Sequence, residues 1–251
     1  MGKKAIGIDI GGTGIKAALV DTKVGELISE RLRIETPAGG GAQDIADACK
    51  GLLDRIGAKP SHPVGICFPA VVRHGYTQSA ANVAQEWIGL NADALFEKAL
   101  NRHVHVINDA DAAGAAEMKF GAGRGSKGLT IMTTLGTGIG TALFYNGVLI
   151  PNAELGHLEI DGQDAEIRAA YSAKERENLS FEQWAQRLQR YYETLERLLV
   201  PDLFIVGGGI SKSHEQFLPL LNLKTKIVPA KTKNSAGIIG AASLAYLNSQ
   251  D

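Results

Sequence analysis

The chain has 251 residues, a formal net charge of −1 and 45% apolar side chains, a composition typical of a globular protein with room for two domains. The even charge balance gives no sign of a nucleic-acid or membrane-surface partner. Cys49 and Cys67 are too few for a disulfide scaffold and too far apart for a CxxC metal motif, so we expect a cytoplasmic protein.

The first half of the chain predicts a glycine-turned hairpin followed by alternating helices and strands. The apolar runs 3–10 and 14–21 predict two strands, and the alternating run 25–36 predicts a third. Helical spacing over 39–57 ends at Gly57, and a second helix begins after Asn91 as its N-cap. Buried strands are expected at the start of 63–72 and over 103–109.

The second half repeats this order. A small-residue helix is expected over 110–121, a strand, glycine turn and strand over 128–150, and a helix from Ser180, which forms a capping box with Gln183. A strand runs into glycines over 201–211, and Ser235 caps a closing helix over 235–247. Residues 128–153 carry no charge and are long enough to span a bilayer, but their threonines and glycines favour buried strands.

The two glycine turns, near residues 11 and 137, indicate two α/β lobes of similar build. Glycine lets several backbone N–H groups approach a phosphate, Thr13 adds a hydroxyl, Lys16 adds a positive charge, and Asp9 is a candidate ligand for Mg²⁺. An ordinary tight turn explains either segment alone equally well. Residues 121–128 miss the P-loop pattern because Ser126 stands where that motif needs glycine, and no Rossmann fingerprint is present.

An acid follows the strand predicted over 103–109. Asp109 stands where a carboxylate is exposed, and a carboxylate suffices as base for phosphoryl transfer to an alcohol. The alternative is that Asp109 caps the helix beginning at Ala110, and the residues alone leave the two interpretations even. Asp111 is the better candidate for capping alone.

Five segments together resemble the ROK family of bacterial sugar kinases in order and spacing. They are DIGGTGIKAALVD (9–21), INDADAAG (107–114), LGTGIGTAL (135–143), ELGHLEID (154–161) and IVGGGIS (205–211). The resemblance covers roughly residues 4–247. It implies the actin-like fold of hexokinases and Hsp70-type ATPases, with two α/β lobes and an active-site cleft between them. We expect a small lobe of 1–107 with a returning helix, 236–251, and a large lobe of 108–235.

The resemblance also assigns roles to residues. It makes Asp109 the catalytic base and implies sugar contacts from Asn82, Asn108, Asp109, Glu154, His157 and Glu166. Trp87 is expected to pack rather than to bind. Phosphate contacts are expected from the turns and their neighbours: Gly11, Gly12, Thr13, Lys16, Gly136, Thr137, Gly138, Gly208 and Gly209.

The chain departs from the family in one place. Most members carry a cysteine-rich zinc motif after the GH element, and this chain has no cysteine there, so we expect no zinc. His157 must then be oriented by a neighbouring carboxylate or backbone group. The missing motif and the CFPAVV loop are most similar to the polyphosphate glucokinase branch, which includes glucomannokinases.

The phosphoryl donor is the remaining question. Residues 211–235 hold five lysines and one acid, Glu215, and residues 121–128 add Arg124 and Lys127, an excess of positive charge that would attract a polyanion. The alternative is a solvated rim of lysines. With the resemblance, we expect transfer from polyphosphate, or from ATP as a second donor, to the 6-hydroxyl of glucose with Mg²⁺. Mannose stays open as an acceptor, and a homodimer is a family expectation.

Two rival functions stay open. One is a strictly ATP-dependent kinase for glucose or another hexose such as N-acetylmannosamine. The other is a non-catalytic sugar sensor, because the family includes repressors. Those carry a helix-turn-helix ahead of the kinase-like part, whereas this sequence starts on its first strand and keeps Asp109, which disfavours the sensor.

Overall fold

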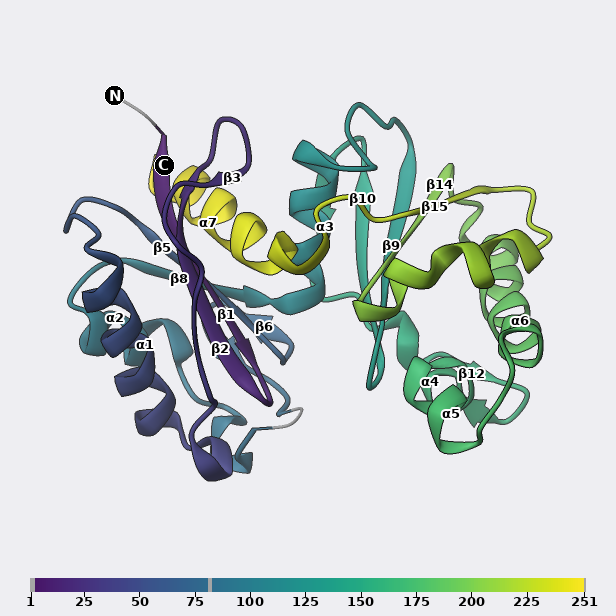
Figure 1. Ribbon diagram of the computed structural model, residues 1–251, viewed down its shortest axis with the longest axis horizontal. Coiled ribbons are helices and arrows are strands. Elements are labelled where there is room, and N and C mark those ends of the chain that lie inside the picture. The colour runs from purple at the N-terminus through teal and green to yellow at the C-terminus, as the bar shows by residue number, and fades with distance from the viewer. Residues whose placement is uncertain (1–2, 81–82, 251) are drawn as a thin grey trace. The chain divides into compact units, whose positions relative to one another are not determined.

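The computed structural model describes residues 3–80 and 83–250, which pack as two units. Unit 1 joins Met1–Ala116 to Ser235–Asp251, and unit 2 is Glu117–Asn234. Each unit has its own sheet with helices packed on it (Figure 1). These are packing units; the functional lobes expected from the sequence, 1–107 with 236–251 and 108–235, stay a prediction.

Unit 1 is built on a six-stranded sheet in the order β3-β2-β1-β5-β8, with β4 also paired to β2. The predicted hairpin is antiparallel, and the two later strands run parallel to its first strand. The strands are β1 (Lys4–Gly11), β2 (Gly14–Asp21), β3 (Glu26–Leu27), β4 (Leu32–Ile34), β5 (Val64–Phe68) and β8 (Val104–Asn108), with a separate hairpin of β6 (Val72–Arg73) and β7 (Tyr76–Thr77).

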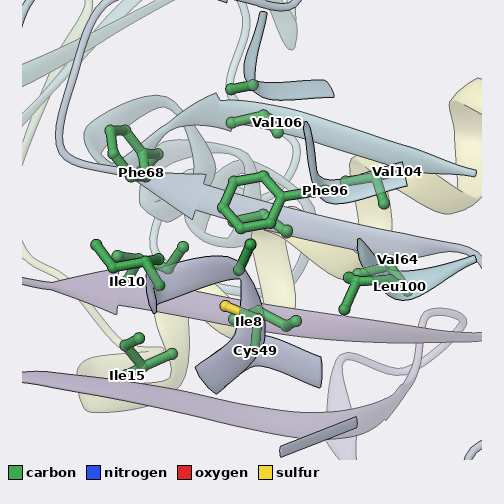
Figure 2. Packing of buried hydrophobic residues seen from close by; sticks show 14 of the residues in the cluster. Ile8, Ile10, Ile15, Cys49, Val64, Phe68, Phe96, Leu100, Val104 and Val106 are labelled. Carbon is green, nitrogen blue, oxygen red and sulfur yellow. The ribbon is translucent and has the colours of Figure 1, made fainter. Parts of the chain in front are cut away.

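The two faces of this sheet are covered by different helices. Ile6, Ile8 and Ile10 of β1 belong to one apolar cluster with side chains of α1 and α2, part of which is seen in Figure 2. Gly7 points to the other face, because successive residues of a strand alternate. A Cβ at Gly7 would overlap the Ile238 carbonyl of α7, so glycine lets this helix lie directly on the strand.

The single strand predicted over 25–36 is wrong, because the segment forms two short strands. The side-chain hydroxyl of Ser29 accepts a hydrogen bond from the backbone N–H of Leu19 at 2.9 Å, where a regular ladder would use a backbone carbonyl. The serine therefore interrupts the pairing with β2, and β3 and β4 form on either side of it.

The helices of unit 1 begin and end largely as predicted. Gly57 ends α1 in the left-handed conformation, and the Asn91 side chain accepts from the Ala94 N–H at the start of α2. Ser235 is not the predicted side-chain cap, because it is the last residue of a 3₁₀ turn and has helical rather than extended backbone angles. The helices are α1 (Ala42–Ile56), α2 (Ala92–Leu100), α3 (Asp109–Phe120) and α7 (Ala236–Asn248), with short η1 (Ala38–Gly40), η2 (Gln85–Trp87) and η6 (Lys233–Ser235).

Unit 2 is built on a five-stranded sheet in the order β11-β10-β9-β14-β15. Again an antiparallel hairpin is followed by a parallel strand beside its first strand. Its strands are β9 (Leu129–Leu135), β10 (Ile139–Tyr145), β11 (Val148–Ile150), β14 (Leu203–Gly207) and β15 (Lys226–Pro229), with a small hairpin of β12 (Glu159–Ile160) and β13 (Gln163–Asp164).

The long helix of unit 2 supplies much of its core. Ser180 and Gln183 form the predicted capping box at its start, and Trp184, Leu188 and Leu195 lie buried on one stripe. The helices are α4 (Ala165–Ala169), α5 (Tyr171–Arg176) and α6 (Phe181–Leu199), with η3 (Leu155–His157), η4 (Gly209–Gln216) and η5 (Leu218–Leu220).

The predicted repetition is therefore present: β2-β1-β5 in unit 1 corresponds to β10-β9-β14 in unit 2. The uncharged stretch 128–153 forms β9, β10 and β11, as favoured above. Among residues 3–80 and 83–250, no helix is both long and apolar enough to cross a bilayer.

A buried carboxylate in unit 2 was not anticipated. Glu117, near the end of α3, is fully buried. Its carboxylate accepts from the backbone N–H groups of Ala122 at 2.7 Å and Lys231 at 2.8 Å, and from both the N–H and the hydroxyl of Thr232. It thus ties the end of α3 to the segment that leads back towards unit 1.

Candidate active site

The glycine turn between β1 and β2 is a tight one. The two strands pair up to Gly11 and Gly14, which leaves Gly12 and Thr13 exposed at the tip. A cation that the sequence analysis missed lies beside it: the Arg33 side chain of β4 donates to the Thr13 carbonyl at 3.1 Å. Because Arg33 reaches the turn only through the β2–β4 pairing, nothing local in the sequence marks it.

Asp9 and Lys16 stand opposite one another in this hairpin. The Lys16 ammonium lies 3.0 Å from Asp9 Oδ2, and the two side chains are 31% and 22% exposed. The Cys67 thiol donates to the other oxygen, Asp9 Oδ1, at 3.4 Å. Both Asp9 oxygens therefore have a protein partner. Lys16, which is predicted to contact phosphate, forms an ion pair with Asp9 in this structure.

Cys67 lies near two carboxylates of unit 1, those of Asp9 and Asp109. It is fully buried, and its thiol pKa is raised well above the usual value by burial and then by the carboxylates of Asp9 and Asp109. The thiol therefore stays protonated at neutral pH. Since β1, β5 and β8 run parallel, Asp9, Cys67 and Asp109 lie towards the same carboxyl edge of the sheet.

Asn108 fixes the start of α3. Its Oδ1 accepts from the N–H groups of Ala110 at 2.9 Å and Asp111 at 3.1 Å, while its Nδ2 donates to the Ala70 carbonyl at 3.1 Å. Asn108, which is predicted to contact sugar, thus uses both polar atoms of its side chain in hydrogen bonds within the protein. Asn108 bonds the amides of Ala110 and Asp111, and Asp111 is fully buried inside the first turn, so capping by Asp111 stays a prediction.

Asp109 follows as an exposed residue at the carboxyl end of β8. Its Oδ1 also accepts from the Ala110 N–H, at 2.8 Å, so part of the alternative capping role is real. That bond holds the carboxylate at the first residue of a helix while leaving the residue exposed. A base for an incoming hydroxyl needs this combination of fixed position and access.

In unit 2 the sequence-predicted sugar residues His157 and Glu166 lie together. His157 Nδ1 is 2.8 Å from Asp164 Oδ2 and 3.9 Å from Glu166 Oε1. The predicted orientation of His157 by a carboxylate is confirmed, and that carboxylate is Asp164, which the sequence analysis did not name. The β12–β13 hairpin brings it back, since Glu159 pairs with Asp164.

The titration of this cluster follows from its contacts. The hydrogen bond to Asp164 is the main cause that raises the pKa of His157 above 6.5. Burial raises the pKa of Glu154 above its usual range. Because an ionised Asp164 only accepts, Nδ1 of His157 is the donor, and Nε2 is left to face a ligand.

The same cluster offers candidate metal ligands. One nitrogen of His157 and one oxygen each from Asp164 and Glu166 lie within 4.8 Å of one another. No cysteine is among them, and the Nδ1–H of His157 is directed at Asp164. The expectation of no zinc stays a prediction.

The second glycine turn is joined to this cluster. Glu166 Oε2 accepts from the Ile139 N–H at 3.0 Å, and a Cβ on Gly138 would overlap that oxygen. The Gly136 N–H donates to the Gly138 carbonyl within the turn. Of the expected nest of phosphate donors, the amides of Gly136 and Ile139 are thus used internally, and the missing side chain of Gly138 allows the close approach of Glu166.

The third glycine segment meets the same turn. Gly208 has φ 81°, and a Cβ there would overlap the backbone of Leu135, the residue that ends β9. The structure therefore brings the segments of Gly136 and Gly208 together, as expected for one phosphate site. Gly209 follows at the start of η4, with open space at its Cα.

Two further expectations concern residues around Trp87. Trp87 is fully buried between Phe68 and Phe96, and its indole N–H donates to the Gly40 carbonyl, which confirms the packing role. Asn82 lies outside the described residues, and its predicted sugar contact stays a prediction.

Known proteins resemble this chain over nearly its whole length. The sequence pattern of the ROK family matches residues 5–167. The polyphosphate glucokinase of Mycobacterium tuberculosis (strain CDC 1551 / Oshkosh) is 44% identical over 241 residues, 96% of this chain and 90% of its own.

Solved structures agree in fold. The inorganic polyphosphate/ATP-glucomannokinase from Arthrobacter sp. strain KM is 50% identical, with a TM-score of 0.92 over 98% of this chain and 99% of its own. A ROK family glucokinase from Streptomyces griseus, solved in complex with glucose and AMPPNP, is 26% identical, with a TM-score of 0.82 over 97% of this chain and 99% of its own.

Proposed function

The chain belongs to the ROK family, and from this premise we propose that it transfers a terminal phosphoryl group from inorganic polyphosphate to the 6-hydroxyl of glucose. It is an enzyme with the actin-like fold of ROK sugar kinases. The observation that carries the substrate pair is the 44–50% identity, over nearly the whole chain, to relatives named polyphosphate glucokinase and inorganic polyphosphate/ATP-glucomannokinase.

Asp109 is the base in this proposal. Its carboxylate takes the proton of the sugar 6-hydroxyl as that oxygen attacks the terminal phosphorus of the donor. The bond between that phosphorus and the bridging oxygen breaks, and the shortened polyphosphate leaves. Asn108 positions Asp109, because its side chain bonds the Ala70 carbonyl and the first amides of α3.

The sugar is held by Glu154, His157 and Glu166 of unit 2. Neutral hydroxyls are distinguished by donors and acceptors at fixed angles, and Asp164 fixes the ring of His157 for this purpose. The phosphate chain lies against the three glycine segments: Gly11, Gly12, Thr13 and Lys16; Gly136, Thr137 and Gly138; and Gly208 and Gly209.

Mg²⁺ fits this set through Asp9. The carboxylate is an oxygen ligand of the kind Mg²⁺ prefers, it is partly exposed, and its bonds to Lys16 and Cys67 favour binding through water. When bound, the ion supplies neutralisation of the phosphate charge. A cytoplasmic location and a homodimer are also part of the proposal, the latter as a family expectation.

ATP is proposed as a second donor, since the Arthrobacter relative is named for both donors. The decisive test measures glucose phosphorylation with polyphosphate and with ATP separately, each with Mg²⁺. We expect turnover with polyphosphate, and mannose in place of glucose tests the broader acceptor range. Turnover with ATP alone would remove polyphosphate as the donor, and no turnover with either would leave a sugar sensor as the better description.

A further inference from the structure

Unit 2 contains a cavity of about 360 Å³ formed by β12, α4 and α6, which none of the assigned roles uses. Its lining includes the apolar residues Ile160, Ala165, Ala169 and Leu179, and most of its other lining residues are polar or charged. A volume of this order is sufficient for a small-molecule ligand.

The cavity wall carries an excess of positive charge. Arg168, Arg187 and Arg190 line it together with a single carboxylate, that of Asp161. Arg190 makes two bonds to Asp161, at 3.0 and 2.6 Å, and Arg187 binds Glu177 and the Arg168 carbonyl. Within the described part of the chain, Arg168 is an exposed residue with no such bond, and its charge adds to the bond from Arg190 in lowering the pKa of Asp161.

Uncharged donors stand beside these arginines. Gln186 makes no side-chain hydrogen bond to the described residues, and Gln183 uses only its carbonyl oxygen, in the capping box. Tyr191 also lines the cavity. It is 1% exposed, and its hydroxyl has no hydrogen-bond partner among the described residues, which is costly for a buried polar group. The two glutamine amides would pair with a ligand that carries several oxygens.

The wall of the cavity is the back of the sugar-contacting segment. Ala165 lines the cavity, while its chain neighbours Asp164 and Glu166 face His157. Tyr191 bridges the two sides: it lines the cavity, and its pKa is raised by burial, by Tyr192 and by the Glu166 carboxylate. A ligand in the cavity would therefore press on the start of α4, where Asp164 is the N-cap and Glu166 lies in the first turn.

We propose that this cavity binds a phosphate monoester of hexose size, and that its occupancy changes the affinity of the sugar cluster for glucose. The phosphate pairs with Arg168 and with the arginines beside it. The sugar hydroxyls meet the side-chain amides of Gln183 and Gln186, and the C–H face of the ring lies against the apolar lining residues.

Direct calorimetric titration tests the binding step. The full chain is saturated with glucose, no phosphoryl donor is present, and glucose 6-phosphate is the probe. We expect one equivalent to bind, and Arg168→Gln to weaken it by about tenfold or more, since a charge-assisted bond is lost. Arg197→Gln is the control, because it changes an exposed arginine of α6 that does not line the cavity.

The arms of the titration separate the possible occupants. Inorganic phosphate is expected to bind more weakly than the ester, because it makes no contact with the glutamine amides or with the apolar lining residues. If short polyphosphate binds and the ester does not, the cavity is part of a donor path and the proposal is overturned. Equal binding of the ester by the parent and Arg168→Gln would also overturn it.

A second measurement tests the coupling. The glucose affinity of the parent, measured without donor, is expected to change several-fold when glucose 6-phosphate is present, beyond the change seen in Arg168→Gln. The same change in both proteins would mean competition at the sugar site and would reject coupling. Neither measurement needs turnover, so failure here is distinguishable from failure of the kinase reaction.

Discussion

Asp109 is an exposed carboxylate whose position is set by buried neighbours. Asn108 before it is 7% exposed and bonds three backbone groups, and the Ala110 N–H donates to Asp109 itself. Removing only the ability to accept a proton should therefore leave the surrounding structure unchanged.

We predict that Asp109→Asn lowers kcat for glucose phosphorylation by about 10²–10⁴-fold, the usual contribution of a general base. Glucose binding and the circular dichroism spectrum should be preserved. Asp54→Asn, which changes an exposed carboxylate on α1, is the control and should keep full turnover. If Asp109→Asn turns over within twofold of the parent, another group is the base.

The His157–Asp164 pair predicts a measurable titration. The pKa of His157 in the folded chain should lie above 6.5 by NMR, and Asp164→Asn should lower it, because the bond to the carboxylate is the main cause of the rise. Glu159→Gln on the same hairpin is the control, since it changes a carboxylate that does not touch the histidine. An unchanged pKa in Asp164→Asn would contradict this assignment.

The sign of the linked stability follows from that shift. Because the folded pKa is raised, the pair stabilises the fold fully at pH values below about 6.5, the unfolded value. This stabilisation is lost as the pH rises through the folded pKa. Since the His157 side chain is 55% exposed, the effect belongs to local order more than to global stability.

Among the elements, the β9–β10 turn offers a matched pair of substitutions. Gly138→Ala places a methyl group against Glu166, so we predict a loss of about 1–3 kcal/mol in the free energy of unfolding, as for overpacking. Gly136→Ala, in the same turn, meets nothing within 4 Å and should stay within about 1 kcal/mol of the parent. Urea unfolding of both variants measures these free energies. Equal losses in the two variants would mean that Glu166 moves away from the added methyl group without cost.

Features set by neighbouring residues were predictable from the sequence. The two hairpins follow from apolar runs on either side of a glycine turn. The cap at Asn91 and the capping box at Ser180 follow from side chains that bond to backbone groups nearby in the sequence. The break at Ser29 was missed, because it depends on the partner strand. The alternating pattern of that segment gives no sign of the interruption.

The candidate site divides in the same way. Asp109 and His157 belong to recognisable motifs, whereas Glu166 lies in a segment that has changed from the family; the structure brings His157 and Glu166 together. Asp164 and Arg33 were missed because chain reversals place them, and Glu117 was missed because two of its partners lie 114 and 115 residues away. From the sequence alone, a buried carboxylate whose backbone partners are distant cannot be distinguished from an ordinary surface carboxylate.

For the whole molecule, the net charge of −1 conceals an ordered distribution of lysines. Lys224 and Lys226 lie at the amino end of β15, whereas Lys231 and Lys233 follow its carboxyl end. Because β15, β14 and β9 are parallel, this second pair belongs to the edge that carries the glycine segments. All four side chains belong to exposed residues.

We predict that replacing Lys231 and Lys233 by Gln raises KM for polyphosphate several-fold and weakens its dependence on salt, since fewer charges attract the polyanion. Replacing Lys224 and Lys226 by Gln makes the same change in net charge at the opposite edge and should have little effect. Steady-state kinetics at two salt concentrations compare the two variants. Equal effects would favour a solvated rim of lysines without a donor path.

The position of α7 also orders the assembly of the protein during translation. It lies on β1 and β5, yet the ribosome makes all of unit 2 between these strands and this helix. The sheet face that carries Gly7 therefore stays uncovered while residues 117–234 emerge. Unit 2 can complete its core on the ribosome, and unit 1, although begun first, is the later of the two to mature.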